Sequence, residues 1–244
     1  MSYKVMDCES HMLYETERDL QLEISKIDLN LFDTYPVSFV RREVHVGGCI
    51  PDLVMVYFGQ DPAYNIWPRT WSYRYSYVIW LLRERGVLSK EEIASLLYAP
   101  IENIAHIIHD LTTKDIIIEN DEGNLLLADY VKNIKAEVVA IEAKLRDWKE
   151  ALSQAVRYKE FANISIVAMD ASMVPKSNDA RNEFINNQVG LWAVSPGIVE
   201  WLIYPTMREY GIGHEKEHIV MSTIIPTTQT FWSRRNRRRA SNHD

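Results

Sequence analysis

The chain has 244 residues, of which 47% are hydrophobic and 25% are charged, and its formal net charge is -7. This length and composition predict a globular protein with one large domain or two small ones. We find no apolar run near the roughly 20 residues of a membrane-spanning helix, and no basic stretch leading into an apolar segment at the N-terminus. We therefore expect a cytoplasmic protein without a membrane partner. Two cysteines, Cys8 and Cys49, are too few for a disulfide framework or a zinc ribbon.

The acidic balance excludes a protein that coats nucleic acid through its overall charge, because phosphate binding needs locally dense Lys and Arg. One such cluster lies beside Trp232, within the last eleven residues: Arg234, Arg235, Arg237, Arg238 and Arg239. This tail is either a disordered, solubilising extension or an arm that holds phosphates.

The first predicted elements are a helix and a hairpin. Between residues 13 and 32 apolar side chains recur at helical spacing, and Glu17 falls on the same face. Residues 37–46 alternate in polarity and end at two glycines, and residues 53–58 are β-branched and aromatic, so both segments are typical of strands. Asp52, preceded by Pro51, therefore stands at the start of a strand.

The middle of the chain predicts a separate small module. Residues 64–74 are rich in Trp, Tyr, Pro and Arg and favour a linker packed by aromatic side chains. Gly86 ends one helical pattern, Ser89 and Glu92 form a capping box for the next, and Pro100 opens a third. The predicted elements are helices at 75–84, 89–97 and 100–111 and a hairpin of 116–118 with 125–127. Three helices followed by a two-stranded wing resemble a winged helix-turn-helix over about residues 73–129.

The last third of the chain predicts an α/β sheet. Residues 138–141 form a buried strand that runs into Glu142, Ala143 and Lys144. A helix follows from about Asp147 to Phe161. The remaining predicted elements are a strand at 164–169, a weak helix at 181–187 and a closing hairpin of 189–194 with 198–204.

Taken in order, Pro51-Asp52 and the strand-end Glu142-Ala143-Lys144 resemble the signature of the PD-(D/E)xK nuclease superfamily. Glu17 on the preceding helix and a Gln-x-x-x-Tyr spacing at Gln154 and Tyr158, similar to that of RecB-type members, extend the resemblance. It implies a restriction-endonuclease-like mixed sheet flanked by helices, made of residues 1–63 and 130–210. Residues 64–129 would be an insertion that carries the winged module, and residues 211–244 a C-terminal extension.

The resemblance implies a magnesium- or manganese-dependent enzyme that hydrolyses phosphodiester bonds of DNA, in repair, recombination or defence. A divalent ion neutralises the phosphate and activates water, and hard cations bind oxygen ligands. Asp52, Glu142 and the backbone carbonyl of Ala143 would bind the ion. Lys144, which shares a strand face with Glu142, would orient or deprotonate the water. Burial and neighbouring carboxylates shift the pKa of that lysine in opposite directions.

Each member of this set also has an ordinary structural interpretation. Glu142 and Lys144 would be a solvated pair at a strand end, and Asp52 would cap a turn. Glu17 would be a helix-surface glutamate, with Glu15 and Glu23 as less well-phased substitutes. Gln154 and Tyr158 would lie on a plain helix surface. The corresponding alternative function is a non-catalytic regulator that binds DNA or protein through the winged module on a nuclease-like scaffold.

The third helix of the module lacks the basic side chains that usually read base edges. It carries Glu102, Asn103, His106, His109 and Asp110, with no Lys or Arg before Lys114. We therefore expect a packing, dimerising or partner-binding role more than DNA reading. The predicted contacts to nucleic acid are Arg69, Arg74 and the tail arginines.

The segment from His214 to His218 matches the H-E-x-x-H pattern of zinc proteases. Two glycines lie just upstream, and downstream only His243 and Asp244 offer a further ligand of the usual kind. We favour a polar loop or a short helix over a zinc site.

Overall fold

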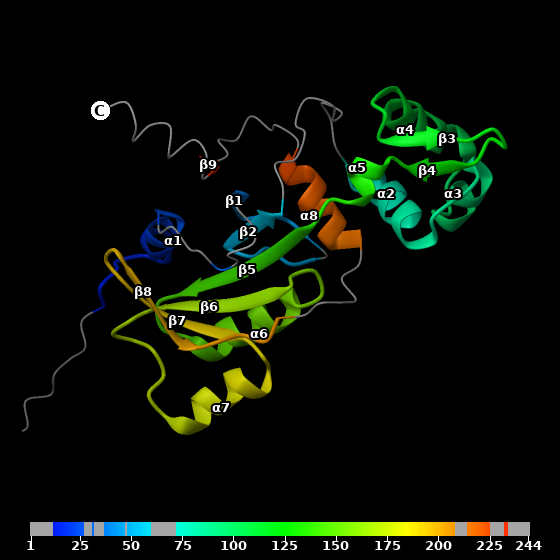
Figure 1. The fold of residues 1–244 in the computed structure, drawn as a ribbon. Coiled ribbons are helices and arrows are strands. Elements are labelled where there is room, and N and C mark those ends of the chain that lie inside the picture. The colour runs from blue at the N-terminus through cyan, green and yellow to red at the C-terminus, as the bar shows by residue number, and fades with distance from the viewer. Residues whose placement is uncertain are drawn as a thin grey trace, which may run out of the picture.

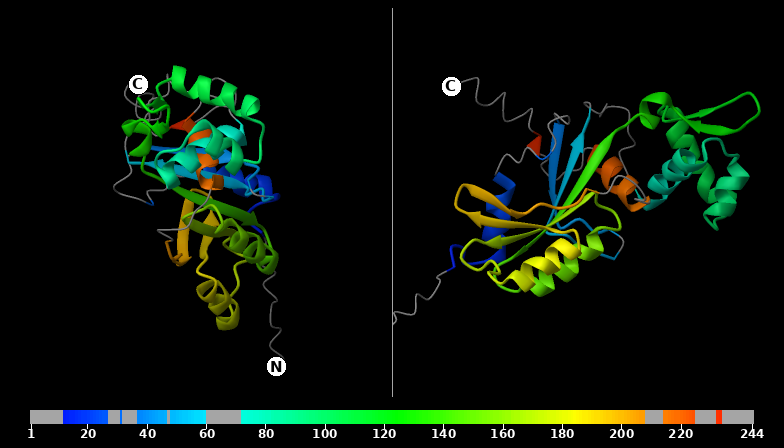
Figure 2. Two further views of the ribbon diagram at one scale, coloured as in Figure 1. Left: turned by 90° about the vertical axis from the view of Figure 1, so that its right-hand side faces the viewer. Right: turned by 60° about the horizontal axis from the view of Figure 1, so that its bottom comes forward.

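The computed structural model describes residues 12–26, 31, 37–46, 48–59, 72–207, 214–224 and 232–233. Its described strands form a mixed sheet that helices flank, as Figures 1 and 2 show, and this confirms the expected α/β class. Across the sheet the strands lie in the order β8 (Ile198–Ile203), β7 (Gly190–Ser195), β6 (Ile164–Asp170), β5 (Ala136–Lys144), β2 (Leu53–Phe58), β1 (Val37–Arg42) and β9 (Trp232–Ser233).

Strands β5, β6 and β7 run parallel, whereas β2 and β1 on one side and β8 on the other are antiparallel to their neighbours. Parallel neighbours need a crossover connection. Here α6 (Trp148–Tyr158) joins β5 to β6, and α7 (Asn178–Asn186) lies between β6 and β7. The hairpin of β1 with β2 and that of β7 with β8 confirm the two predicted strand pairs.

Alternating side chains of β5 divide the core between the two faces of the sheet. Val139, Ile141 and Ala143 pack in one buried cluster, with Leu20 and Ile24 of α1 (Glu17–Lys26). Val138 and Ala140 pack in the other, with apolar side chains of α6. Because side chains two apart in a strand share a face, Glu142 and Lys144 belong to the α6 side.

Along the chain, the predicted module comes after β2 and before β5. These two strands are hydrogen-bonded neighbours in the sheet. It consists of α2 (Tyr73–Arg85), α3 (Lys90–Leu96), α4 (Ile101–Thr113), β3 (Ile117–Glu119), β4 (Leu125–Leu127) and a short helix, α5 (Asp129–Lys132). The predicted capping box at Ser89 is present, and Gly86 ends α2 with a positive φ of 85°. Pro100 is the N-cap of α4 and not its first helical residue.

The hairpin of the module carries one further backbone contact that the sequence did not predict. Leu88, between α2 and α3, forms an isolated bridge with Leu125 of β4. Asn120 closes the turn between β3 and β4 by accepting from the amides of Glu122 and Asn124 at 3.1 and 2.9 Å. Buried side chains of the module join the cluster on the α6 face of the sheet.

Helix α8 (His214–Ile224) contacts α2, β5 and β2 and so joins the module to the sheet. The Arg83 guanidinium donates to both oxygens of Glu217, at 2.9 and 3.0 Å. The ring of His218 stacks on Tyr73 with 3.9 Å between the centroids, and its Nδ1 lies 3.0 Å from the hydroxyl of Ser76. The H-E-x-x-H segment is therefore helical, and two of its polar side chains contact α2.

Several expectations concern residues that the structure does not describe. Arg69, the aromatic stretch up to residue 71 and the tail arginines lie outside the described ranges. Among the described residues no helix is long and apolar enough to cross a membrane. The division of the chain into a nuclease-like core, an insertion of residues 64–129 and a C-terminal extension stays a prediction.

Candidate functional site

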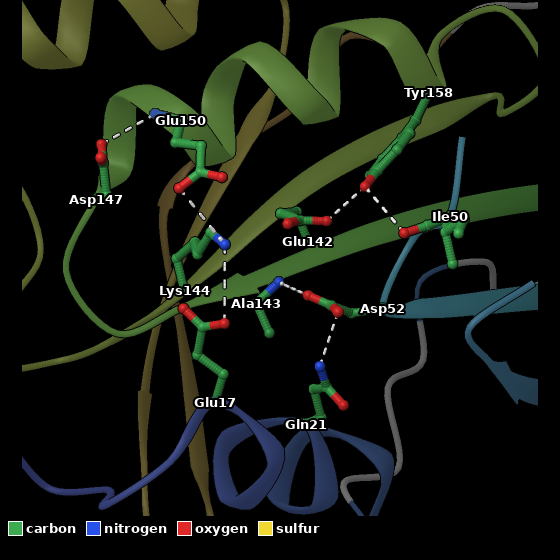
Figure 3. A network of polar contacts seen from close by, with 10 residues as sticks. All are labelled: Glu17, Gln21, Ile50, Asp52, Glu142, Ala143, Lys144, Asp147, Glu150 and Tyr158. Carbon is green, nitrogen blue, oxygen red and sulfur yellow. Dashed lines mark hydrogen bonds and ion pairs between the residues drawn. The ribbon is translucent and has the colours of Figure 1, made fainter. Parts of the chain in front are cut away.

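Asp52, Glu142 and Lys144 lie together where β2 begins and β5 ends (Figure 3). Leu53 pairs with Ile141, so the residue before β2 and the residues after Ile141 meet at one edge of the sheet. Glu142 is 4% exposed, which places a carboxyl group within the core. Such a group is costly to bury unless it is protonated, hydrogen-bonded or paired with a cation.

Both carboxylate oxygens of Asp52 accept a hydrogen bond. The backbone N–H of Ala143 donates to Oδ2 at 2.7 Å, and the side-chain amide of Gln21 donates to Oδ1 at 2.7 Å. Gln21 is itself buried on α1. Burial raises the pKa of Asp52, against the lowering effect of the Ala143 amide. The two donors fix the orientation of the carboxylate.

Glu142 accepts a hydrogen bond of 2.5 Å from the phenol of Tyr158, and that phenol oxygen also lies 3.5 Å from the carbonyl of Ile50. Burial, and then the negative charge of Asp52, raise the pKa of Glu142 to about 7, although the Tyr158 hydrogen bond opposes the shift. Burial and the carboxylate also raise the pKa of Tyr158, so the phenol remains a donor. Two adjacent acids that resist being charged together favour a cation between them.

Lys144 lies between carboxylates from two helices. Its ammonium group is 3.7 Å from Glu17 on α1 and 3.6 Å from Glu150 on α6. Burial is the largest single influence and lowers the pKa of Lys144, but Glu17, Glu150, Glu142 and Asp52 together outweigh it and raise that pKa. Lys144 therefore carries its positive charge at neutral pH.

Helix α6 presents one stripe of polar side chains to this site. Asp147 caps the helix by accepting from the amide of Glu150 at 3.0 Å. Glu150, Gln154 and Tyr158 follow one another at spacings of four residues and therefore share a helix face. Oε1 of Gln154 is buried, and within the described part of the chain it has no hydrogen-bond partner. Along α6, Gln154 lies one turn from Glu150, which contacts Lys144, and one turn from Tyr158, which donates to Glu142.

The structure thus brings together Asp52, Glu142, Ala143, Lys144, Glu17 and Tyr158, and Gln154 lies on α6 on the same helix face as Tyr158. Glu17 contacts the lysine, and Ala143 contributes its amide N–H. Of the substitutes considered, Glu23 instead contacts Lys26 and the amide of Gly197. Gln21 and Glu150 were not predicted from the sequence. Both were visible as polar residues four positions from a selected one, Gln21 after Glu17 and Glu150 before Gln154.

The donor set fits a hard divalent cation held by few protein ligands. Within the described ranges no three His, Cys, Asp or Glu side chains gather as ligands around one point. Magnesium commonly needs only one or two carboxylates, with waters and substrate phosphates as its other ligands. The neighbouring carboxyl groups of Asp52, which is partly buried, and Glu142, which is buried, meet that requirement, and both supply oxygen.

The predicted nucleic-acid contacts are only partly described. Arg74 is exposed in the first turn of α2. On α4 the exposed side chains include Glu102, Asn103, His106 and His109, and His106 lies 3.5 Å from Asp110. Lys90, next to the wing, is paired with Glu119 at 3.3 Å. Helix α4 therefore has no Lys or Arg on its exposed face, and the turn between β3 and β4 exposes Asp121 and Glu122.

Comparison of the chain with protein-family models, curated proteins and solved structures gave no match.

Proposed function

We propose that this protein is a metal-dependent nuclease of the PD-(D/E)xK type. The observation that carries the proposal is the buried carboxyl group of Glu142 next to the partly buried one of Asp52, with the ammonium group of Lys144 beside them (Figure 3). A folded chain gains nothing in stability from burying two repelling acids at one place, so a functional role accounts for their position.

Asp52 and Glu142 are the residues that would hold the divalent ion, which neutralises charge on a phosphodiester and lowers the pKa of water. The chain's own groups would do the rest. Gln21 and the Ala143 amide hold the Asp52 carboxylate in one orientation, and Tyr158 does the same for Glu142. Preorganised ligands of this kind need no rearrangement as charge develops.

Lys144 would stabilise negative charge on the phosphoryl oxygens and orient the attacking water. Its raised pKa makes it a poor proton acceptor at neutral pH, so we assign it electrostatic stabilisation and not general base catalysis. Glu17 and Glu150 hold its ammonium group at the edge of the site. The unpartnered oxygen of Gln154 would accept a hydrogen bond from water or substrate.

We propose that the inserted module is a winged helix-turn-helix that contacts a protein partner or a second copy of this chain. The order of its elements and the Leu88 bridge to the wing support the first part. The lack of Lys and Arg on α4 supports the second, because phosphate binding needs local positive charge. Nucleic acid would instead contact Arg74 and the other basic residues predicted from the sequence, which are Arg69 and the arginines of the C-terminal tail.

The direct test is cleavage of single-stranded, duplex and branched DNA, and of RNA, with Mg²⁺ or Mn²⁺. Glu142→Gln keeps the size of the side chain and an oxygen for Tyr158, but removes the charge that binds the ion. We expect cleavage by the wild type and none by this variant, since residues that serve one transition state act as a unit. Glu183→Gln, on the exposed surface of α7, is the matched control. Equal cleavage by Glu142→Gln would refute the assignment.

A further inference from the structure

A cavity of about 410 Å³ lies between the loop that joins β1 to β2 and the first residues of α2 and α8. His45, Cys49 and Ile50 line it from the loop, and Tyr73 and Glu215 line it from the two helices. Its volume is within the range of small-ligand sites in proteins. The cavity therefore has room for a group of the size of a nucleotide.

The wall of the cavity that the loop provides is preformed by backbone hydrogen bonds. Val46 and Cys49 exchange two such bonds, of 2.9 and 2.7 Å, and the amide of Glu43 donates to the carbonyl of Asp52 at 3.2 Å. Gly48 completes the tight turn with a φ of 75°, which a residue with a side chain rarely adopts. The loop is thus tied at its tip and at its base.

The lining combines apolar side chains, aromatic rings and one carboxylate. Cys49 is buried, while the Ile50 side chain is 50% exposed. The Tyr73 ring is held by its stacking on His218, and Glu215 adds a carboxyl group to the lining. An aromatic ring beside apolar side chains suits a flat ring that can stack.

The cavity adjoins the carboxylate site through Ile50. The side chain of Ile50 lines the cavity, and its carbonyl lies 3.5 Å from the phenol that donates to Glu142. Two residues later the same loop provides Asp52. Arg74, the residue after Tyr73 in α2, is exposed.

We infer that this cavity binds an unpaired nucleobase next to the phosphodiester in the carboxylate site, so that the substrate is single-stranded or locally unpaired nucleic acid. The inference rests on the proposed nuclease function and specifies its substrate. A base within a duplex has its faces covered by stacking and its edge paired, so it reaches such a cavity only by leaving the stack. Unpaired strands present their bases at no such cost.

The test measures binding by the uncleaving Glu142→Gln protein, with and without Mg²⁺. Three probes are compared: a short oligothymidylate, the same sugar-phosphate chain with abasic sugars, and the matching duplex. Base stacking on protein contributes about 1–3 kcal/mol per base. We therefore expect the base-bearing strand to bind roughly tenfold or more tightly than the abasic one. The duplex should bind more weakly than the single strand.

Two exposed side chains of the loop then test the cavity itself. His45→Ala combined with Ile50→Ala should remove most of the preference for bases and leave abasic binding unchanged, which also shows that the variant is folded. Ile198→Ala is the matched control, because Ile198 is 62% exposed on β8. A preference that survives the double substitution overturns the inference, as does duplex binding equal to single-strand binding or no binding of any probe.

The outcomes separate the two proposals. Cleavage by the wild type without base-dependent binding would leave the nuclease and remove the cavity's role. Base-dependent binding that the double substitution abolishes, together with no cleavage by the wild type, would leave the cavity as a site for unpaired bases and remove the nuclease.

Discussion

At the scale of single residues, hydrogen-bond donors orient both candidate metal ligands. Gln21 and the Ala143 amide occupy one lone pair on each oxygen of Asp52, and Tyr158 occupies one on Glu142. A carboxylate oxygen has a second lone pair, which stays available for an ion. Groups that orient ligands in this way typically change metal affinity by about 10- to 100-fold when they are replaced.

Gln21→Met keeps the length of the side chain but removes the donor to Asp52. We expect the Mg²⁺ concentration for half-maximal cleavage to rise by about 10-fold or more, while the rate at saturating Mg²⁺ changes much less. The measurement is a metal titration of the cleavage rate. A fall in the saturated rate with an unchanged metal requirement would contradict a positioning role. Ser25→Ala, on the same helix, is the control.

The raised pKa of Glu142 predicts how stability depends on pH in metal-free protein. Between the ordinary glutamate pKa of 4.5 and about 7, the unfolded chain has released this proton and the folded chain still holds it. The free energy of unfolding therefore falls as pH rises through that window, and stays lower above it.

Glu142→Gln has no such titration, so it should become more stable than the wild type as pH rises from 4.5 to 8. Relative to the wild type, the free energy of unfolding of the variant should rise by on the order of 3 kcal/mol over this range. Urea unfolding in the presence of a chelator measures the difference between the two proteins at each pH. A difference that does not vary with pH would mean that Glu142 ionises as it would in water.

At the scale of elements, the helix ends and turns that depend on side chains close in sequence could be predicted. The capping box at Ser89, the stop at Gly86 and the turn at residues 120–124 were visible because the side chains that form them lie within a few residues. The meeting of Asp52 with Glu142 was predicted by the family resemblance and not by any local signal. Gln21 and Glu150 were missed although each lies four positions from a selected residue, because the contacts that give them a role depend on how α1 and α6 pack against β5.

Helix α8 was the least predictable element, because its polar sequence offers no clear apolar stripe and its partners lie on α2 and β5. Arg83 and Glu217 carry much of the contact with α2, and Glu217 is 9% exposed. Arg83→Met would leave this carboxylate buried without its cation. We expect a loss of about 2 kcal/mol in the free energy of unfolding, lower than for a fully buried pair because Arg83 is partly exposed.

Lys90→Met tests the same kind of change at an exposed pair, since Lys90 and Glu119 are 39% and 42% exposed. Exposed pairs contribute about 0–1 kcal/mol. Chemical denaturation of both variants, and of Arg83→Met combined with Glu217→Met, measures the coupling. Equal losses at the two pairs would show that α8 does not depend on this contact.

At the scale of the whole molecule, the inserted module leaves and rejoins the sheet between neighbouring strands, so it adds a surface without interrupting the site. That explains why Asp52 and Glu142 are 90 positions apart in the sequence and still lie close together, at the ends of adjacent strands. The surface it adds on α4 has no Lys or Arg. Association with nucleic acid must therefore depend on basic clusters elsewhere in a chain whose net charge is -7.

The densest such cluster in the sequence is the tail from Arg234 to Arg239. Removal of residues 234–244 should weaken nucleic-acid binding and flatten its salt dependence, because each phosphate contact contributes about 0.9 to the slope of log K against log salt on duplex DNA and about 0.7 on single strands. Asn103→Ala with His106→Ala, on the exposed face of α4, should have a smaller effect on that slope. Salt titrations of binding by the two proteins decide between these surfaces. If the truncation leaves the slope unchanged while the α4 substitutions abolish sequence-dependent binding, the module reads DNA and the tail does not hold it.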